Sequence, residues 1–407
     1  AYVRGYQGNS LQGNDEILAC VKHFALYGAS ESGRDYNTVD MSRLRMYNEY
    51  LAPYKAAVDA GVGSVMSSFN IIDDIPATAN KWLLTDLLRD EWSFGGLLVT
   101  DYNSIAEMAS HGIAPLKEAS VRALKAGTDM DMVSCGFLNT LEESLKEGKI
   151  MEDQINTACR RVLEAKYKLG LFSNPYKYGD TLRVKEQLYT AEHRSAARAI
   201  ASETFVLLKN ENHLLPLGLK GKIALVGPMA DARNNMCGMW SMACTASRHG
   251  TLLEGIRSAA GDKAEILYAK GSNVYEDAEM EKAAAGIRPL EHEDNRKLLD
   301  EALRVASRAD VIVAALGECA EMSGESASRT NLEIPDAQQN LLKALLKTGK
   351  PVVLLLFTGR PLVLNWEDAN VHSILNVWFG GSETGDAVAD VLFGKVTPSG
   401  KLTTTFP

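Results

Sequence analysis

Residues 94–104 read FGGLLVTDYNS, a buried-strand pattern that ends in an acidic residue. A glycine pair leads into the apolar residues Leu97, Leu98 and Val99, which is typical of a strand buried on both faces of a parallel sheet. The carboxylate of Asp101 follows directly, before residues that indicate a helix start. Functional side chains in parallel α/β folds lie where a strand ends and its loop begins, so Asp101 is a candidate site residue.

The sequence on either side of this stretch alternates short apolar runs with amphipathic helical patterns. Strands are predicted at 20–28, 63–70, 96–101 and 128–133. Helices are predicted at 42–61, 80–93, 119–127, 136–148 and 152–170. This order predicts an α/β fold with a parallel sheet.

Four strand–helix units are half of a (β/α)8 barrel, so residues 1–170 are predicted to be the C-terminal half of one. A half barrel alone would leave strand edges exposed, which natural proteins avoid. We therefore expect the first half of the barrel to precede Ala1 in a longer protein.

A second α/β unit is predicted after a linker at 171–200, where periodicity is lost and Pro, Gly and charge increase. A helix is predicted over 190–210. Strongly apolar strands are predicted at 222–228, 264–271, 310–318, 351–357 and 372–379. Residues 201–407 are thus expected to form a parallel-sheet α/β sandwich domain, with 275–297 as a charged surface insertion.

Composition excludes some function classes. The formal net charge is -9 and no long basic run occurs, which argues against a nucleic-acid partner. No apolar run reaches the roughly 18–20 residues of a membrane helix, so no membrane partner is expected. The six cysteines form no CxxC pair. Cys237 and Cys244 are close enough in sequence to be bridged, but free buried thiols are expected.

Three predicted strand ends carry polar side chains. Lys22 and His23 interrupt an apolar strand, and they suit hydrogen bonds to substrate hydroxyls as well as a partnered structural role. Asp101 is compatible with a nucleophile, a metal ligand or a helix N-cap. A receiver-like phosphoacceptor would need an acidic cluster on an earlier strand for magnesium, and the sequence has none in the expected place.

The third strand end opens the loop 317–335, which carries Glu318, Glu321 and Glu325 among small residues. A solvated acidic loop is the alternative interpretation. Two carboxylates that face one site are the minimum for glycoside hydrolysis, in which one attacks or activates water and the other protonates the leaving oxygen. A nucleophile in one unit and an acid in the next would explain why two α/β units are joined.

Five segments in order resemble glycoside hydrolase family 3, and most closely its bacterial periplasmic β-glucosidase type. They are residues 21–40, 61–102, 202–217, 223–228 and 398–407. The resemblance implies a retaining, exo-acting β-glucosidase with Asp101 as nucleophile and Glu325 of GESASRT as general acid/base. Glu318 would be structural, and Glu321 is the reserve for the acid.

Other positions follow from the same resemblance. Lys22 and His23 match the pair that binds glycone hydroxyls. Phe69 stands where the family often has Tyr, which removes a possible hydroxyl contact, and Tyr102 replaces a frequent Trp in the wall of the sugar site. Ser241 of MWSMA is expected to line the site from the second domain.

The implied mechanism places the two carboxyl groups about 5–5.5 Å apart and needs no metal or organic cofactor. The acid must begin the reaction protonated near neutral pH. The family also uses sugar-binding residues from the early barrel strands and commonly has a fibronectin-like domain at the C-terminal end. Both would lie outside these residues, so we expect the stretch alone to fold poorly or to be weakly active.

The expected partner is a small carbohydrate. The oligomeric state stays open, and the resemblance implies a periplasmic or secreted protein. A β-xylosidase or another exo-glycosidase of the family is an alternative. So is a non-catalytic sugar-binding protein, which the presence of both Asp101 and Glu325 disfavours.

Overall fold

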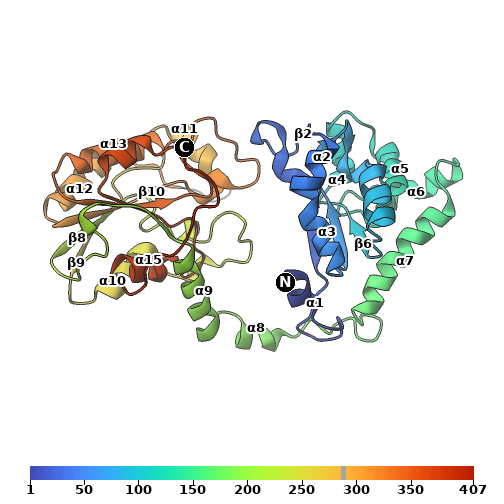
Figure 1. The fold of residues 1–407 in the computed structure, drawn as a ribbon, viewed down its shortest axis with the longest axis horizontal. Coiled ribbons are helices and arrows are strands. Elements are labelled where there is room, and N and C mark those ends of the chain that lie inside the picture. The colour runs from blue at the N-terminus through green and yellow to red at the C-terminus, as the bar shows by residue number, and fades with distance from the viewer. Residues whose placement is uncertain (286–289) are drawn as a thin grey trace. The chain divides into compact units, whose positions relative to one another are not determined.

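The computed structural model describes residues 1–285 and 290–407. The chain divides into two compact units, Ala1–Val184 and Lys185–Pro407, called unit 1 and unit 2 below (Figure 1). Each has parallel strands and helices of its own, so the predicted mixed α/β class is confirmed.

The main sheet of unit 1 has three parallel strands in the order β1-β3-β6. Their bounds are β1 Cys20–Phe24, β3 Ser64–Ser67 and β6 Leu97–Val99. A smaller sheet joins β2 Thr38–Val39, β4 Ile71–Ile72 and β5 Ile75–Pro76. Leu83, Leu84, Leu87 and Leu88 lie fully buried in one cluster with Phe24 of β1.

The strand predicted at 128–133 is wrong. Met130 makes only an isolated parallel bridge with Val99. The cause is Asp129, whose carboxylate accepts the backbone N–H of Leu98 at 2.8 Å and so takes part of the bonding edge of β6. Because a side chain, rather than a backbone carbonyl, accepts this N–H, the segment forms a loop beside β6 instead of a regularly hydrogen-bonded strand.

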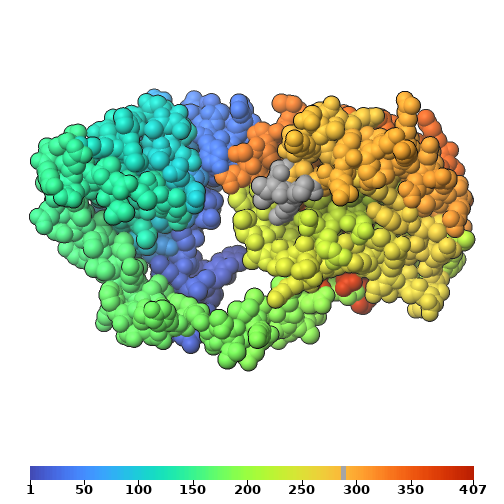
Figure 2. All heavy atoms as spheres, turned by 180° about the vertical axis from the view of Figure 1, so that it is seen from behind, coloured from blue at the N-terminus to red at the C-terminus, as the bar shows by residue number. Residues whose placement is uncertain are grey.

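Helices surround this sheet. Their bounds are α1 Tyr2–Gln7, α2 Arg43–Arg45, a π-helical turn Met46–Leu51, α3 Ala52–Asp59, a π-helical segment Trp82–Glu91, α4 Ser104–Ser110, α5 Leu116–Ala126, α6 Gly136–Lys146 and α7 Glu152–Lys168. In α7 only Ala158 and Ala165 are buried, and this helix forms part of the surface of unit 1 (Figure 2).

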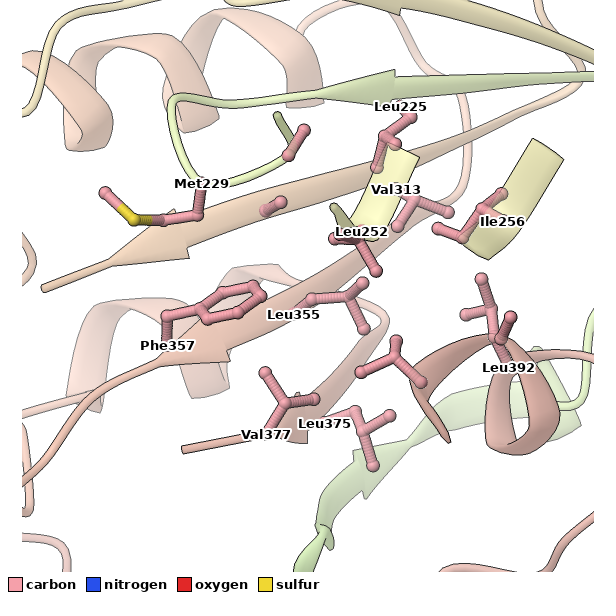
Figure 3. Close-up of a cluster of buried hydrophobic side chains, with 14 of the residues drawn as sticks. Leu225, Met229, Leu252, Ile256, Val313, Leu355, Phe357, Leu375, Val377 and Leu392 are labelled. Carbon is pink, nitrogen blue, oxygen red and sulfur yellow. The ribbon is translucent and has the colours of Figure 1, made fainter. Parts of the chain in front are cut away.

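Unit 2 contains a six-stranded sheet in the order β7-β12-β11-β10-β8-β9. Its strands are β7 Val206–Asn210, β8 Lys222–Val226, β9 Glu265–Ala269, β10 Val311–Gly317, β11 Val352–Phe357 and β12 Ser373–Asn376. All neighbours pair parallel except β7, which pairs antiparallel with β12. Apolar side chains pack on both faces, and Figure 3 shows the face that includes Leu225, Val313 and Phe357.

The helix predicted over 190–210 is correct in its first part and wrong from Phe205 onward. Helix α9 spans Ala191–Thr204, and Phe205 then adopts extended backbone that leads into β7. The apolar run after Phe205 fits the edge position beside β12, so tertiary pairing overrides the helical continuation.

The other helices of unit 2 are α10 Leu252–Ala260, α11 Ala278–Ala285, α12 Asn295–Ser307, α13 Asp336–Leu346, α14 Asn365–Asn370 and α15 Thr384–Leu392. The residues predicted as a linker contain α8 Thr181–Gln187 and the start of α9. Single 3₁₀ turns occur at Tyr27–Ala29, Glu31–Gly33, Ala77–Ala79, Glu211–His213, Arg233–Asn235, Ala246–Arg248 and Ala320–Ser323.

The predicted surface insertion at 275–297 is only partly exposed. Glu281 and Ala285 of α11 are buried, while residues 286–289 lie outside the described residues. Among the helices of the described ranges, none combines the length and apolarity needed to cross a membrane.

The cysteine prediction needs a correction. Cys237 and Cys244 form a disulfide, with their Cα atoms 6.5 Å apart, rather than two free thiols. Of the unpaired cysteines, Cys319 is buried as expected, whereas Cys20, Cys135 and Cys159 are exposed.

Candidate active site

Asp101 lies just after the carboxyl end of β6 and is 9% exposed. Its Oδ1 accepts the backbone N–H of Tyr102 at 2.7 Å, and its Oδ2 lies 3.4 Å from His23 Nε2. The position before α4 belongs to Asn103, and no side chain caps that helix there. The N-cap alternative for the Asp101 side chain is therefore wrong, and the carboxylate is held beside an imidazole instead.

His23 comes from β1, the strand two places from β6 in the sheet. Burial lowers the pKa of His23 from its ordinary value, and Lys22 adds to this effect, whereas the charges of Asp101 and Asp35 oppose it. A neutral imidazole can offer one donor and one acceptor to hydroxyl groups. Lys22, on the neighbouring position of the same strand, is exposed.

Aromatic rings surround this strand end. Phe69 is 8% exposed, with its ring centroid 5.0 Å from that of Tyr36 and 6.0 Å from that of Tyr27. The Tyr27 ring lies 5.4 Å from the His23 ring. Tyr102 differs from these rings, because 62% of its surface is exposed. The structure thus places Phe69 in a ring cluster with His23 and leaves Tyr102 at the surface.

Sequence reasoning missed Tyr27, Tyr36 and Thr100. The Thr100 hydroxyl accepts the N–H of Met132 and donates to the carbonyl of Asp101, each at 2.9 Å. It therefore ties the loop that carries Asp101 to the neighbouring segment. The signal was present in the sequence, since a lone hydroxyl ends an otherwise apolar strand.

Glu107, on α4, was also missed. Burial raises its pKa, and the charge of Asp101 adds to the effect. A second carboxyl within electrostatic range makes the surroundings of Asp101 more negative. Helix periodicity alone gives no reason to single out this residue.

Glu325 belongs to unit 2 and lies in the loop after β10. It is exposed, and it lines a pocket of about 390 Å³ together with Glu321, Tyr275, Met280 and Arg329. Glu321 is half-buried in the same pocket. The loop thus presents two carboxylates to one hollow of unit 2.

Glu318 holds this loop in place. It is fully buried and pairs with Arg329 at 2.8 Å and with Arg360 at 3.1 Å. Its Oε2 accepts the Thr358 hydroxyl at 2.9 Å. Arg360 also donates to the carbonyls of Met322 and Ala327. A carboxylate with this many donors is structural, as the resemblance implied.

Ser241 lies in the disulfide-closed loop 237–244. Its hydroxyl donates to the carbonyl of Gly238 at 2.8 Å. Within the described residues, three side chains with metal-ligating atoms lie close together, namely Cys237, Cys244 and His249. The two cysteines belong to this same loop. That group lies in unit 2, whereas Asp101 lies in unit 1.

Comparison with known proteins gives two family matches. Residues 1–165 match the N-terminal domain of glycosyl hydrolase family 3, and residues 205–407 match the C-terminal domain of the same family.

Curated relatives are similar over the whole chain. One is a periplasmic β-glucosidase of Salmonella typhimurium, 45% identical over 415 residues, with 100% of this chain and 54% of the relative covered. Another is a β-xylosidase of Formosa agariphila, 36% identical over 425 residues, with 100% and 56% covered. The chain thus spans about half the length of these relatives.

Solved structures are also similar to this chain over its whole length. A β-glucosidase from Listeria innocua in complex with isofagomine is 38% identical with a TM-score of 0.88, and covers 100% of this chain and 54% of its own. The complex of that enzyme with glucose is 39% identical, with a TM-score of 0.87 and 53% of its chain covered. Two adjacent domain matches in the family's order, and these relatives, show that the chain belongs to glycosyl hydrolase family 3.

Proposed function

We propose that this chain carries the catalytic residues of a retaining β-glucosidase that removes terminal β-D-glucosyl groups from short oligosaccharides or glucosides. The observation that carries the proposal is Asp101, a nearly buried carboxylate at the end of a parallel strand. One oxygen of Asp101 is fixed by a backbone N–H, and the other faces His23. The relatives named β-glucosidase support the glycone, and so does the relative solved with glucose.

The proposed chemistry has two displacement steps. Asp101 attacks the anomeric carbon while Glu325 protonates the departing oxygen, which gives a covalent glycosyl-enzyme. Water then attacks the same carbon, with Glu325 as base, and the carboxylate of Asp101 leaves with the configuration retained. Lys22 and His23 are proposed to bind sugar hydroxyls. Phe69 is proposed as an apolar wall, and Tyr102 and Ser241 as outer contacts.

The architecture we propose for unit 1 is the C-terminal half of a (β/α)8 barrel. The order of its parallel strands, β1-β3-β6, and the helices between them support this. For unit 2 we propose an α/β sandwich, with residues 171–200 joining the two domains. A periplasmic or secreted location is supported by the disulfide and by the name of the Salmonella relative.

Azide rescue tests the acid assignment. In the protein that contains this chain, Glu325→Ala should lower the rate by about 10²–10⁴-fold, and azide should restore turnover with formation of a β-glucosyl azide. Glu321→Ala is the matched control from the same pocket and should need no rescue. Rescue of the Glu321 variant instead would assign the acid to that residue.

A β-xylosidase is the second candidate, because a relative that is 36% identical carries that name. The two candidates differ by one hydroxymethyl group on the sugar. Rates on aryl β-glucoside and aryl β-xyloside, measured on one preparation, discriminate between them. A higher kcat/KM on the xyloside would replace the glucosidase proposal, and sugar binding without turnover on either would favour a binding protein.

A further inference from the structure

Three side chains with metal-ligating atoms converge in the segment between β8 and α10. One ligand atom each from Cys237, Cys244 and His249 lies within 4.8 Å of the other two. The Sγ of Cys237 lies 3.8 Å from Nε2 of His249. The two cysteines are paired as a disulfide, so the cluster as it stands is a bridge with an imidazole beside it.

The His249 ring is oriented toward the sulfurs. It is 5% exposed, and its Nδ1 lies 3.2 Å from the carbonyl oxygen of Gly250. Because a carbonyl only accepts, Nδ1 carries the hydrogen and Nε2 turns a lone pair toward Cys237. A disulfide sulfur has no hydrogen to donate to that lone pair. An imidazole whose Nδ1–H binds a backbone carbonyl is the usual arrangement of a metal-ligating histidine.

The backbone around His249 is held firmly. Arg233 donates to the His249 carbonyl and pairs with Glu254 at 2.5 Å. Glu254 accepts the N–H of Thr251, and the Thr251 hydroxyl accepts the N–H of Glu254, which closes a capping box at the start of α10. A ligand fixed in this way loses little conformational entropy when it binds an ion.

The loop that bears the cysteines is anchored at its start. The carbonyl of Met236 accepts the N–H of Gly381 at 3.0 Å, and the N–H of Gly238 binds the carbonyl of Asn235 at 3.1 Å. A Cα separation of 6.5 Å between the cysteines allows their sulfurs to separate by side-chain rotation alone. Zinc bonds of about 2.3 Å to sulfur and about 2.0–2.1 Å to nitrogen, at tetrahedral angles, require an S···N separation of about 3.6 Å. The observed 3.8 Å is close to that value.

We propose that Cys237, Cys244 and His249 form a redox-gated site for a thiophilic divalent cation such as Zn²⁺, which excludes the disulfide and is excluded by it. A dithiol reductant supplies two electrons and two protons, so the bridge opens to two thiols while the reductant becomes a disulfide. Zn²⁺ then binds the two thiolates and Nε2, and two protons are released. Three protein ligands leave one coordination position to water.

The segment between the two cysteines packs against the loop that carries Glu325. Met239, between the two cysteines, lies so close to Gly324 that a Cβ placed on that glycine would be 2.1 Å from Met239 Cγ. Opening the bridge and drawing both sulfurs toward His249 therefore acts on a loop packed against the residue that precedes Glu325. The metal site itself does not depend on the proposed function.

Cobalt titration tests the site directly. The protein that contains this chain is reduced, freed of reductant under anaerobic conditions and titrated with Co²⁺ as a spectroscopic substitute for zinc. We expect thiolate-to-cobalt charge-transfer absorption that saturates at one ion per chain and disappears when Zn²⁺ is added. The oxidised chain should show none. A reduced, folded chain without this absorption would overturn the proposal.

Variants identify the ligands. Cys237→Ser and Cys244→Ser should each diminish the absorption, and His249→Gln should weaken cobalt binding by at least about tenfold. Cys135→Ser and Cys159→Ser are the matched controls, because both thiols are exposed elsewhere, and they should leave the titration unchanged. An unchanged titration in the Cys244 variant would contradict the assignment.

A measurement on the unaltered chain covers the case in which a variant fails to fold. Zn²⁺ should slow alkylation of Cys237 and Cys244, identified by peptide mass spectrometry, and leave the alkylation of Cys135 and Cys159 unaffected. Equal alkylation of all four thiols with and without zinc would overturn the proposal.

Discussion

The position of the Asp101 carboxylate is set by contacts with neighbouring residues. Its two oxygens have separate partners, the Tyr102 N–H and the His23 ring, and its backbone carbonyl is bound by the Thr100 hydroxyl. Each contact comes from a different element or residue of unit 1. Substitutions here should therefore change the properties of the neighbours in a defined direction.

The pKa of His23 should report the charge of Asp101. In wild-type protein burial lowers this pKa, and the Asp101 carboxylate raises it in part. Asp101→Asn removes the charge but keeps the shape, so the His23 pKa should fall further. NMR titration of the His23 ring in both proteins measures this. Asp86→Asn, at an exposed carboxylate, is the control, and a rise in the His23 pKa in Asp101→Asn would contradict the geometry.

His23 should also make stability depend on pH. Its folded pKa lies below the ordinary value of 6.5, so the unfolded chain binds a proton first as the pH falls. Stability should therefore decrease as the pH drops from about 6.5 toward the folded pKa, because the unfolded state binds more protons there. His23→Gln should flatten that part of the profile. Urea midpoints of both proteins across this range provide the test, and parallel profiles would exclude His23 as the cause.

Segment 128–133 shows how an element can differ from its pattern. Periodicity predicts a strand, yet Asp129 uses its carboxylate to bind Leu98 N–H, Arg89 and Arg161 at once. A buried carboxylate shared by two guanidinium groups fixes β6 and α7 relative to this segment. The contacts of the Asp129 side chain, rather than a strand ladder, therefore hold segment 128–133 in place.

Asp129→Ala should destabilise unit 1 strongly. The side chain of Asp129 is 1% exposed and that of Arg89 is 7% exposed, so the variant leaves a buried cation without its partner. The expected loss is about 3–5 kcal/mol in the free energy of unfolding. Hydrogen exchange of β6 amides in urea measures it. Glu142→Ala breaks an exposed pair on α6 and should leave the exchange unchanged. Equal effects of the two variants would show that Asp129 does not hold this element.

At the scale of the whole molecule, the main sheets of the two units differ in size. Unit 2 has apolar side chains on both faces of six strands. The main sheet of unit 1 has three strands and ends at β1 and β6. Residues 185–407 produced alone should therefore unfold cooperatively, with a free energy of unfolding of about 5–15 kcal/mol. Thermal unfolding by circular dichroism tests this, and a broad, featureless transition would contradict it.

The buried strands were predictable from the sequence, because a long apolar run between turn residues is stable only when it is buried. Val311–Gly317 and Val352–Phe357 could hardly be exposed. It failed at Val206–Asn210, where pairing with a distant strand overrides local propensity, and at Asp129, whose partners are remote in sequence. For the site, motifs nominate Asp101 and Glu325, whose catalytic roles stay predictions. The roles of Tyr27, Tyr36 and Thr100 depend on contacts that no local pattern encodes.

The proposed role of Asp101 as the nucleophile of a retaining enzyme can be tested by trapping the covalent intermediate. Incubation of the protein that contains this chain with a 2-deoxy-2-fluoro aryl β-glucoside should trap the glycosyl-enzyme, and peptide mass spectrometry should locate the label at Asp101. Asp101→Asn should abolish labelling and lower turnover by about 10⁴-fold or more. A label on any other carboxylate of an active protein, or full turnover by Asp101→Asn, would show that Asp101 is not the nucleophile.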